Sequence, residues 1–575
     1  MMKTLNVGAA ARNPCRAFRR PCPWGSHFRR HVQTGPGIRL NRASLGYGLF
    51  GVLVGAALAA SALPGTFVSS KARGPPSVRS PTEQHRYADT RTMLQVTITP
   101  FPAVTNVCLL TDCNPKAAKE IQNLLGEEAV STDHDDLEAH GYSEWSTSNS
   151  TVRPVAVIRP TCTEDIVLIA KICTKYKIPM VPFGAGSSVE GNFSTPHSGF
   201  TVDLSLMDKI LEFHEDDMDA VVQPGVRWVD LNENIKSSGL FLPLDPSPTA
   251  MIGGMVATNC SGTNAMRYGT MKDWVINLTV VLADGTVIKT RRRPRKTSAG
   301  YNLNGLFTGS EGTLGIISEI TVKLAVVPSH FSVATAAFPT IEDAASAAFK
   351  MMREGIPLAA LELMDDTQMR VINQSGGAGG RSTWREAPTL FMKFSGTEAA
   401  VKESMARAGA ISERFRGKDF RVATSKAEMD DLWSARKQAL WATLAVRPEG
   451  TQIWSTDVAV PLSRMAEIIA SSKEAASKLG LFSTLLGHVG DGNFHQAIMY
   501  HPEKQEQVAA VADCVDTMMT QALMLDGTVS GEHGIGLGKK GCLAKELGPA
   551  TINVMRTLKQ ALDPDGILNP GKVFD

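Results

Sequence analysis

The sequence predicts an α+β fold built from more than one domain. Its 575 residues exceed the usual size of one domain, and 43% of them are hydrophobic, which is enough for a large core. From Pro154 onward, short apolar strand-like runs alternate with helical segments. After about residue 330 the chain changes to longer Ala- and Met-rich helices with strands between them. We therefore expect an N-terminal domain over 101–330 and a C-terminal α+β domain over 331–575.

Residues 1–82 differ in charge from the rest of the chain. They contain 12 of the 59 Lys and Arg residues and no acidic residue, which leaves residues 83–575 with 47 basic and 57 acidic side chains, a net charge of −10. Because the basic excess lies in a leader and not on a folded face, the sequence predicts no nucleic-acid partner. An Arg-rich leader without acidic residues is typical of a mitochondrial presequence, which we expect over 1–44.

An uncharged apolar run over 45–63 follows the leader. Its 19 residues, LGYGLFGVLVGAALAASAL, come close to the roughly 20 that span a bilayer core. We expect a transmembrane sorting segment that anchors the protein in the inner mitochondrial membrane, with the body facing the intermembrane space. A matrix location is the alternative, and a bacterial signal peptide is disfavoured because the charged region before the run is too long. Residues 64–100, which contain several prolines, are predicted to be a linker.

The expected elements of the N-terminal domain begin with a strand at 154–160. A helix over Thr163–Tyr176 follows, for which Thr163 is the expected N-cap. A second strand at 179–183 ends in the loop GAGSSVEGN. Further strands are expected at 200–205, 220–226, 276–290 and 315–327, and the Ala-Asp-Gly inside the third of these predicts a hairpin.

The C-terminal domain is predicted to be rich in helices. They are expected at 342–354, 398–413, 426–445, 461–479, 505–526 and 549–562. The nine cysteines of the chain include no Cys-x-x-Cys pair, so the sequence predicts neither a disulfide framework nor a cysteine-based zinc site.

The loop after the strand at 179–183 is the first candidate ligand site. Gly184 and Gly186 suggest a dinucleotide-binding motif, but the next glycine is 191 instead of 189, and NFSTPHSGF does not look like the start of a helix. A Walker A loop is excluded because the sequence has no Gly-Lys-Ser/Thr. Two interpretations remain from the residues alone: a nest of backbone N–H groups that binds phosphate, or an ordinary glycine-rich turn.

A second candidate site lies in STLLGHVGDGNFHQAIMY, residues 483–500. Two strand-like runs flank Gly-Asp-Gly-Asn, which places His488 and His495 on either side of a tight turn. Such a pair suggests a metal site, although a lone His in a strand is more often a satisfied polar residue. A third ligand would come from the loop SGEHGIG, where Glu532 and His533 are adjacent.

The order of the N-terminal motifs resembles the vanillyl-alcohol-oxidase-type FAD-binding domain. The motifs are PFGAGSS (182–188), DPSPT (245–249), IGGMVATNCSG (252–262), RYG (267–269) and GSEGTLGII (309–317). The resemblance implies a two-subdomain FAD-binding domain over 101–330, with its core at 150–330. It also implies that FAD is held non-covalently, since none of these loops contains a His for covalent attachment.

The residues that the resemblance assigns to FAD form three groups. The pyrophosphate would lie on Pro182, Phe183, Gly184, Ala185, Gly186, Ser187 and Ser188. The ribityl and isoalloxazine side would be lined by Pro246, Thr249, Gly253, Gly254, Thr258, Ser261 and Gly262. The adenine end would be held by backbone groups of Glu311, Gly312, Gly315, Ile316 and Ile317. Small residues in these loops are consistent with a backbone that approaches a bulky flat cofactor.

The C-terminal motifs resemble the FAD-linked oxidase C-terminal domain of D-2-hydroxyacid dehydrogenases. GHVGDGNFH (487–495), SGEHG (530–534) and ILNPGK (567–572) carry the resemblance. It implies a substrate domain that caps the flavin, in which His488, His495 and Glu532 bind a divalent metal, zinc or manganese. His533 would be the general base. Arg436, which alone would look like a solvated helix residue, would bind the substrate carboxylate, with Asn493 near the substrate and Asn569 near the flavin.

This resemblance implies oxidation of a D-2-hydroxy acid by hydride transfer to flavin N5, with metal-assisted deprotonation of the 2-hydroxyl. TDVAVPLSR (456–464) and GDGNFH (490–495) are most similar to the branch that oxidises D-lactate to pyruvate. That branch passes electrons to cytochrome c, a basic protein suited to an acidic body. The alternative is a D-2-hydroxyglutarate dehydrogenase that reduces an electron-transfer flavoprotein. An alkyl-dihydroxyacetonephosphate-synthase-like transferase and a non-catalytic binding protein are disfavoured because the candidate catalytic residues are all present.

Overall fold

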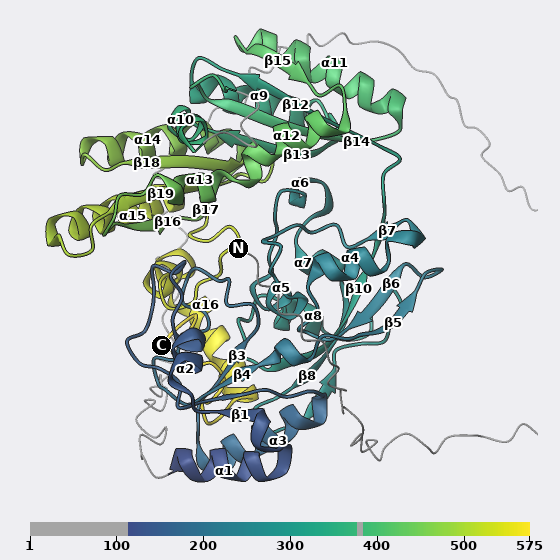
Figure 1. Cartoon of the computed structure of the whole chain (residues 1–575), viewed down its shortest axis with the longest axis vertical. Helices are drawn as coiled ribbons and strands as arrows, with labels where there is room; N and C mark the ends of the chain where they lie inside the picture. The colour runs from purple at the N-terminus through teal and green to yellow at the C-terminus, as the bar shows by residue number, and fades with distance from the viewer. Residues whose placement is uncertain (1–112, 376–382) are drawn as a thin grey trace, which may run out of the picture. The chain divides into compact units, whose positions relative to one another are not determined.

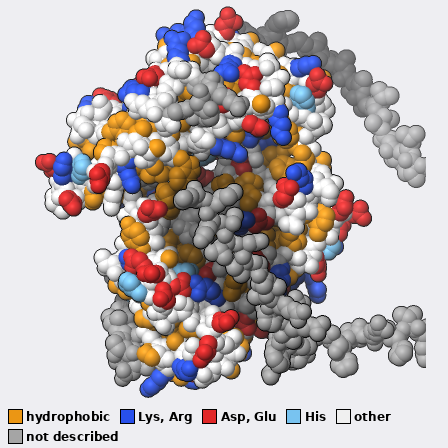
Figure 2. Space-filling model, in the orientation of Figure 1, with side chains coloured by type: hydrophobic (Ala, Val, Ile, Leu, Met, Phe, Trp, Pro, Cys, Tyr) orange, Lys and Arg blue, Asp and Glu red, His pale blue; other side chains and the backbone are white. Residues whose placement is uncertain are grey.

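The computed structural model describes residues 113–375 and 383–575 (Figure 1). The predicted presequence, membrane segment and linker all lie outside the described residues. In the part of the chain that is described, no helix combines the length and the apolar character needed to cross a membrane. Lys or Arg side chains and Asp or Glu side chains are interspersed over the face shown in Figure 2.

The first sheet has four strands and contains the strand before the glycine-rich loop. Its order is β1 (Val130–Ser131), β2 (Ala156–Ile158), β4 (Phe200–Asp203) and β3 (Met180–Phe183), with β2, β4 and β3 parallel. Helix α3 (Thr163–Tyr176) packs on α1 (Cys113–Leu125) and buries Ile166, Ile169 and Cys173 at helical spacing. The expected N-cap was wrong by one residue. Cys162 occupies that position, and Thr163 Oγ1 instead donates to Ser318 Oγ at 3.0 Å.

The second sheet is antiparallel throughout and packs beside the first. Its order is β5 (Ile210–His214), β6 (Asp219–Val222), β10 (Ile316–Lys323), β8 (Val275–Val281) and β9 (Val287–Lys289). The predicted hairpin is confirmed, since β8 and β9 pair across the Ala-Asp-Gly turn. Helix α3 contacts both β8 and β10, and Val281 and Ile316 are buried in the core of the first sheet, so the two sheets share a core.

Short elements connect these strands. A two-stranded sheet pairs β7 (Leu240–Phe241) with β11 (Ala325–Val326). The helices are α2 (His134–Gly141), α4 (Trp228–Asn234), α5 (Ile252–Thr258), α6 (Ala265–Tyr268), α7 (Met271–Trp274) and α8 (Leu303–Phe307). Of these, α5 packs on β10 and carries the predicted IGGMVAT motif. No helix begins between residues 184 and 199, so the glycine-rich loop does not open a dinucleotide-type helix.

The third sheet has eight strands, all from residues 330–500. Along its main path the order is β15 (Lys418–Val422), β12 (His330–Ala337), β14 (Thr389–Gly396), β13 (Leu358–Met364), β18 (Ser483–His488), β19 (Asn493–Tyr500) and β16 (Gln452–Ser455). The short β17 (Val458–Ala459) also pairs with β19. The predicted Gly-Asp-Gly-Asn turn joins β18 to β19, in the register His488 opposite Asn493.

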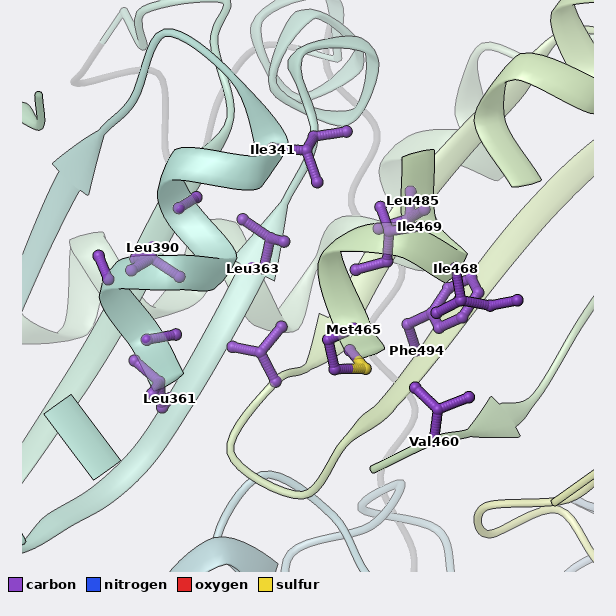
Figure 3. Close-up of a cluster of buried hydrophobic side chains, with 14 of the residues drawn as sticks. Ile341, Leu361, Leu363, Leu390, Val460, Met465, Ile468, Ile469, Leu485 and Phe494 are labelled. Atoms are coloured by element: carbon purple, nitrogen blue, oxygen red, sulfur yellow. The ribbon is translucent and has the colours of Figure 1, made fainter. Parts of the chain in front are cut away.

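Helices cover both faces of the eight-stranded sheet. One face is covered by α9 (Ile341–Arg353), α11 (Glu398–Arg414), α14 (Met465–Lys478) and α15 (Gln505–Met524). Figure 3 shows Met465, Ile468 and Ile469 of α14 packed near Phe494 of β19 and Leu485 of β18. The other face carries α10 (Asp366–Gln374), α12 (Lys426–Lys437) and α13 (Ala439–Ala445). The predicted helix at 426–445 is therefore two helices, which meet at Gln438.

The C-terminal segment returns to the first sheet. Helix α16 (Lys540–Leu562) is kinked at Gly548–Pro549, where proline cannot donate the helical hydrogen bond. Beyond it, Met180 N donates to Ile567 O at 2.7 Å and Asn569 N donates to Met180 O at 2.8 Å. Ile567 and Leu568 are fully buried in the core of that sheet. The ILNPGK motif thus lies beside the strand that leads into the glycine-rich loop.

Candidate active site

A cavity lies where the loops after β3, α5 and α8 meet. It is lined by Pro182, Phe183, Gly184, Leu204, Pro224, Gly253, Gly254, Ala257, Gly312, Gly315 and Ile317. Eight of these eleven residues belong to the set expected to bind FAD. Leu204, Pro224 and Ala257 do not. Leu204 and Pro224 lie outside the glycine motifs, and Ala257 lies within IGGMVATNCSG but carries no signal beyond being small.

Two glycines of this cavity show different reasons for lacking a side chain. A Cβ on Gly253 would lie 2.5 Å from Pro224 Cβ, so this glycine allows α5 to approach a neighbouring loop. A Cβ on Gly254 would meet no atom within 4 Å and would project into open space. Gly253 is therefore needed for packing, whereas Gly254 leaves room for a ligand.

The two histidines of the β18–β19 hairpin lie side by side. Their ring centroids are 5.3 Å apart and the rings are nearly perpendicular. His488 Nδ1 is 2.9 Å from Glu362 Oε1, and His495 Nδ1 is 3.0 Å from the carbonyl oxygen of Thr456. Because an Nδ1–H donated to each oxygen leaves Nε2 with its lone pair, both rings present Nε2 as a ligand atom.

Glu532 completes this group from the loop after α15. Its Oε1 lies 3.4 Å from His488 Nε2 and 3.2 Å from His495 Nε2, and the three ligand atoms lie within 4.8 Å of one another. Two neutral histidines and one carboxylate form a donor set that zinc and manganese accept. The residues therefore fit a divalent cation.

Glu532 also contacts the N-terminal part of the chain. Its Oε2 accepts a hydrogen bond from Ser261 Oγ and another from Gly262 N at 3.3 Å. Both donors belong to the motif expected to line the flavin. One carboxylate thus joins the histidine pair to the predicted flavin side of the cavity.

His533 stacks on the histidine pair. Its ring is 4.9 Å from that of His495, at 12° between the ring planes. Its Nδ1 is 3.8 Å from Glu190 Oε1 and makes no hydrogen bond to the described residues. Burial lowers the pKa of His533, but Asp457, Glu190 and Glu532 together outweigh this effect and raise the pKa from its ordinary value.

Asp457 holds the loop that carries Glu532 and His533. Its Oδ2 accepts hydrogen bonds from Glu532 N at 3.0 Å and from His533 N at 2.9 Å. The fully buried carboxylate pairs with Lys539 and accepts a hydrogen bond from Asn493 Nδ2 at 2.8 Å. Asn493 also donates to Val458 O, so both N–H groups of its amide are used inside this cluster. Asn493 therefore has a structural role, and its predicted position near the substrate stays a prediction.

Arg436 is buried and paired, not solvated. Its Nε and Nη2 lie 2.9 and 2.7 Å from Glu362 Oε2, while the other oxygen of Glu362 faces His488. Without a bound cation, burial opposes the charge on His488, but Glu362 and then Glu532 outweigh this effect and raise the pKa of His488 to about 10. A cation would therefore bind Nε2 in place of a proton. Sequence reasoning missed Glu362, although a single carboxylate inside the apolar run LAALELM was a signal for it.

The side chain of Glu311 contacts the loop after α15, while the role of its backbone at the adenine end stays a prediction. Its carboxylate accepts hydrogen bonds from Ile535 N at 2.7 Å and Gly536 N at 2.8 Å, and Asn569 Nδ2 donates to its carbonyl oxygen at 2.6 Å. Its neighbour Gly312 lines the cavity. Glu311 thus connects the cavity wall to the loop that carries Glu532 and His533.

Comparisons with known proteins match both halves of the chain. The model of the FAD binding domain matches residues 154–291, and that of the FAD linked oxidases, C-terminal domain, matches residues 327–573. The mitochondrial D-lactate dehydrogenase (cytochrome) of Kluyveromyces lactis is 45% identical over 471 residues, which cover 80% of this chain and 81% of that protein. The protein of the same name in Arabidopsis thaliana is 44% identical over 448 residues, 78% of each chain. The chain belongs to this family of FAD-linked oxidases.

The expected fold class is confirmed as well. The solved structure of p-cresol methylhydroxylase matches with a TM-score of 0.68 at 19% identity, and covers 81% of this chain and 98% of that chain. At this identity the likeness is one of fold. Family membership gives the chain an FAD-binding domain, and the open space at Gly254 leaves room for a flat cofactor.

Proposed function

We propose that this protein oxidises D-lactate to pyruvate, with FAD as the hydride acceptor and a divalent cation bound by His488, His495 and Glu532. The observation that carries the proposal is the position of Glu532. Its carboxylate faces both histidines with one oxygen and Ser261 and Gly262 with the other. A substrate at this point lies between a cation site and the predicted flavin side of the cavity.

The reaction removes a proton from the 2-hydroxyl and a hydride from C2, and leaves a C=O double bond. Bound FAD supplies the two-electron acceptor, and a bound divalent cation supplies positive charge that lowers the pKa of the hydroxyl. The substrate hydroxyl proton goes to Nε2 of His533, whose ring is fixed by its stacking on His495. Asp457 fixes the backbone of the same loop and stabilises positive charge on His533.

The substrate and the electron acceptor are inferred from the relatives. Those at 43–45% identity are all named mitochondrial D-lactate dehydrogenase (cytochrome). We extend D-lactate, cytochrome c and a mitochondrial location from them to this chain. The net charge of −10 on residues 83–575 supports a basic electron acceptor. An inner-membrane position facing the intermembrane space rests on the apolar run over 45–63.

Anaerobic mixing of the FAD-loaded protein with four substrates tests the proposal. D-lactate should bleach the flavin absorbance, and L-lactate should not, since one face of C2 must meet the flavin. D-2-hydroxyglutarate and glycolate should bleach it more slowly. Reoxidation by cytochrome c then tests the acceptor. Fast bleaching by D-2-hydroxyglutarate with none by D-lactate would instead support the alternative substrate.

A further inference from the structure

Lys393 is a charged residue on the sheet face that also carries Glu362. It lies on β14, where it pairs with Val333 of β12 and Ala360 of β13. Both partners are buried in the apolar cluster beneath α10, α12 and α13. Glu362 lies two residues from Ala360 on the same strand and therefore points to the same face. Diagonal neighbours on adjacent strands are within reach of long side chains.

The ammonium group of Lys393 lies over an aromatic ring. Its Nζ is 4.2 Å from the centre of the Trp433 ring, one turn before Arg436 on α12. Among the described residues, Lys393 has no carboxylate within ion-pair distance and no hydrogen-bond acceptor. A cation over a ring is attracted to it, but the ring carries no net charge to neutralise the lysine.

Arg436 has a carboxylate partner, and Asp245 is held by neutral hydrogen-bond donors. Arg436 presents both Nε and Nη2 to Glu362, which also faces His488. Asp245, in the loop that leads to the predicted flavin side, accepts hydrogen bonds from Asn264 N and Thr263 Oγ1. Burial lowers the pKa of Lys393, and the charge of Asp245 opposes this shift without forming an ion pair with the lysine. Of the two cations, Lys393 is therefore the one without a carboxylate in contact, whereas Arg436 has Glu362.

We propose that Lys393 binds the carboxylate of the substrate, together with Nη1 of Arg436, the guanidinium nitrogen that Glu362 does not use. This inference rests on the proposed function and refines it. A half-buried cation is costly unless an anion pairs with it, and a 2-hydroxy monocarboxylate brings one negative charge to one cation that lacks an ion pair. A dicarboxylate would bring a second charge without a partner. The structure thus favours small 2-hydroxy monocarboxylates as the substrate class.

Three variants test the role of Lys393. Lys393→Met removes the charge and keeps most of the volume, and Lys393→Arg keeps the charge. Lys437→Met removes a charge from an exposed position on α12, the helix that carries Trp433 and Arg436. Each FAD-loaded protein is mixed anaerobically with increasing D-lactate, which separates the dissociation constant from the limiting rate of flavin reduction. Oxalate binding, measured through the change in flavin absorbance, gives a readout that needs no turnover.

We expect Lys393→Met to raise the dissociation constants of D-lactate and oxalate roughly 10- to 100-fold, the loss typical of a charged hydrogen bond. The limiting rate should change much less. Lys393→Arg should restore most of the affinity, and Lys437→Met should bind as the wild type does. Unchanged affinities in a folded, FAD-loaded Lys393→Met protein would overturn the inference. A wild type that D-lactate does not reduce would contradict the proposed function, while oxalate binding would still report on Lys393.

Discussion

Glu362 Oε1 lies 2.9 Å from His488 Nδ1, in a fully buried pair that joins two neighbouring strands of the eight-stranded sheet. The carboxylate fixes the tautomer of a ring whose Nε2 faces the proposed metal site. Its second oxygen orients Arg436. Glu362, which lies outside every recognised motif, thus positions His488 and Arg436, which lie inside such motifs.

Replacing Glu362 should weaken metal binding without removing a metal ligand. In Glu362→Gln a neutral amide replaces the carboxylate. It faces His488 Nδ1–H either with its oxygen, which is a weaker acceptor, or with its N–H group, which cannot accept at all. We expect the affinity for Mn²⁺ to fall roughly 10- to 100-fold, as is usual when a partner behind a histidine ligand is removed. Electron paramagnetic resonance of free Mn²⁺, added to FAD-loaded and metal-stripped protein, measures this. Glu474→Gln, on the exposed side of α14, is the control, and equal affinities in the two variants would refute the role.

His533→Ala tests the proposed base. Since no other group is proposed to take the hydroxyl proton, we expect flavin reduction by D-lactate to slow roughly 10²- to 10⁴-fold. The protein should remain yellow and keep its FAD, because His533 is not among the residues that line the cavity. Stopped-flow absorbance measures the rate, with His134→Ala on the surface as the control. Near-normal reduction would exclude His533 as the base.

Gly254→Val tests the position of the cofactor. The new side chain meets no protein atom but enters the cavity, so the fold should persist while FAD affinity falls. Overpacking of this size should cost about 1–3 kcal/mol of binding free energy. Quenching of FAD fluorescence measures the dissociation constant. Gly541→Val, where a Cβ also meets nothing, is the matched control on α16. Wild-type affinity in Gly254→Val would place the cofactor elsewhere.

Glu311→Ala should loosen the loop that carries Glu532 and His533. The change leaves Ile535 N–H and Gly536 N–H without their acceptors. We expect amide hydrogen exchange over 530–536 to become about tenfold faster or more, and flavin reduction to slow with it. Mass spectrometry of exchanged peptides provides the measurement, and Glu319→Ala on β10 is the control. Unchanged exchange would show that Asp457 alone holds the loop.

The buried Lys572 should make the free energy of unfolding increase with pH. Burial lowers the pKa of Lys572 to about 7, against an ordinary value of 10.5, although Glu311 opposes the shift. Between these values the unfolded chain holds a proton that the folded chain lacks, so stability is highest above the unfolded pKa and is lost as the pH falls towards 7. The free energy of unfolding should therefore increase from pH 7.5 to 9 by up to about 1.4 kcal/mol per pH unit.

Lys572→Met should lack this increase, and the exposed Lys545→Met should keep it. The midpoint of urea unfolding at the two pH values, followed by tryptophan fluorescence, compares the three proteins. A wild-type midpoint that changes with pH no more than that of Lys572→Met would contradict the lowered pKa.

Much of the site could be predicted from motifs that lie close together in sequence. The hairpin of His488 and His495 needed only its turn residues, and the glycine-rich loops marked most of the cavity wall. Glu532 was found because it stands in a glycine-packed loop. For the hairpin the spacing along the chain fixes the geometry, whereas Glu532 reaches the histidines only through the tertiary fold.

The residues missed are those that depend on long-range pairing. Glu362 and Lys393 reach Arg436 and Trp433 only after β13 and β14 have paired and α12 has packed across them. The carboxylate of Glu311 likewise contacts a loop more than two hundred residues away, a contact that its local motif did not predict. A single charged residue in an apolar strand was the available signal for Glu362 and Lys393. Such a residue must have a partner in the fold, but the sequence does not say which residue that partner is.

Flavin reduction with and without metal tests the central claim most directly. The FAD-loaded protein is stripped of divalent cations with a chelator, divided, and one half is restored with Mn²⁺. The account predicts that D-lactate bleaches the flavin of the restored half and reduces the stripped half at least about a hundredfold more slowly, with FAD retained in both. Equal rates in the two halves would contradict the assignment of His488, His495 and Glu532 to a catalytic metal site.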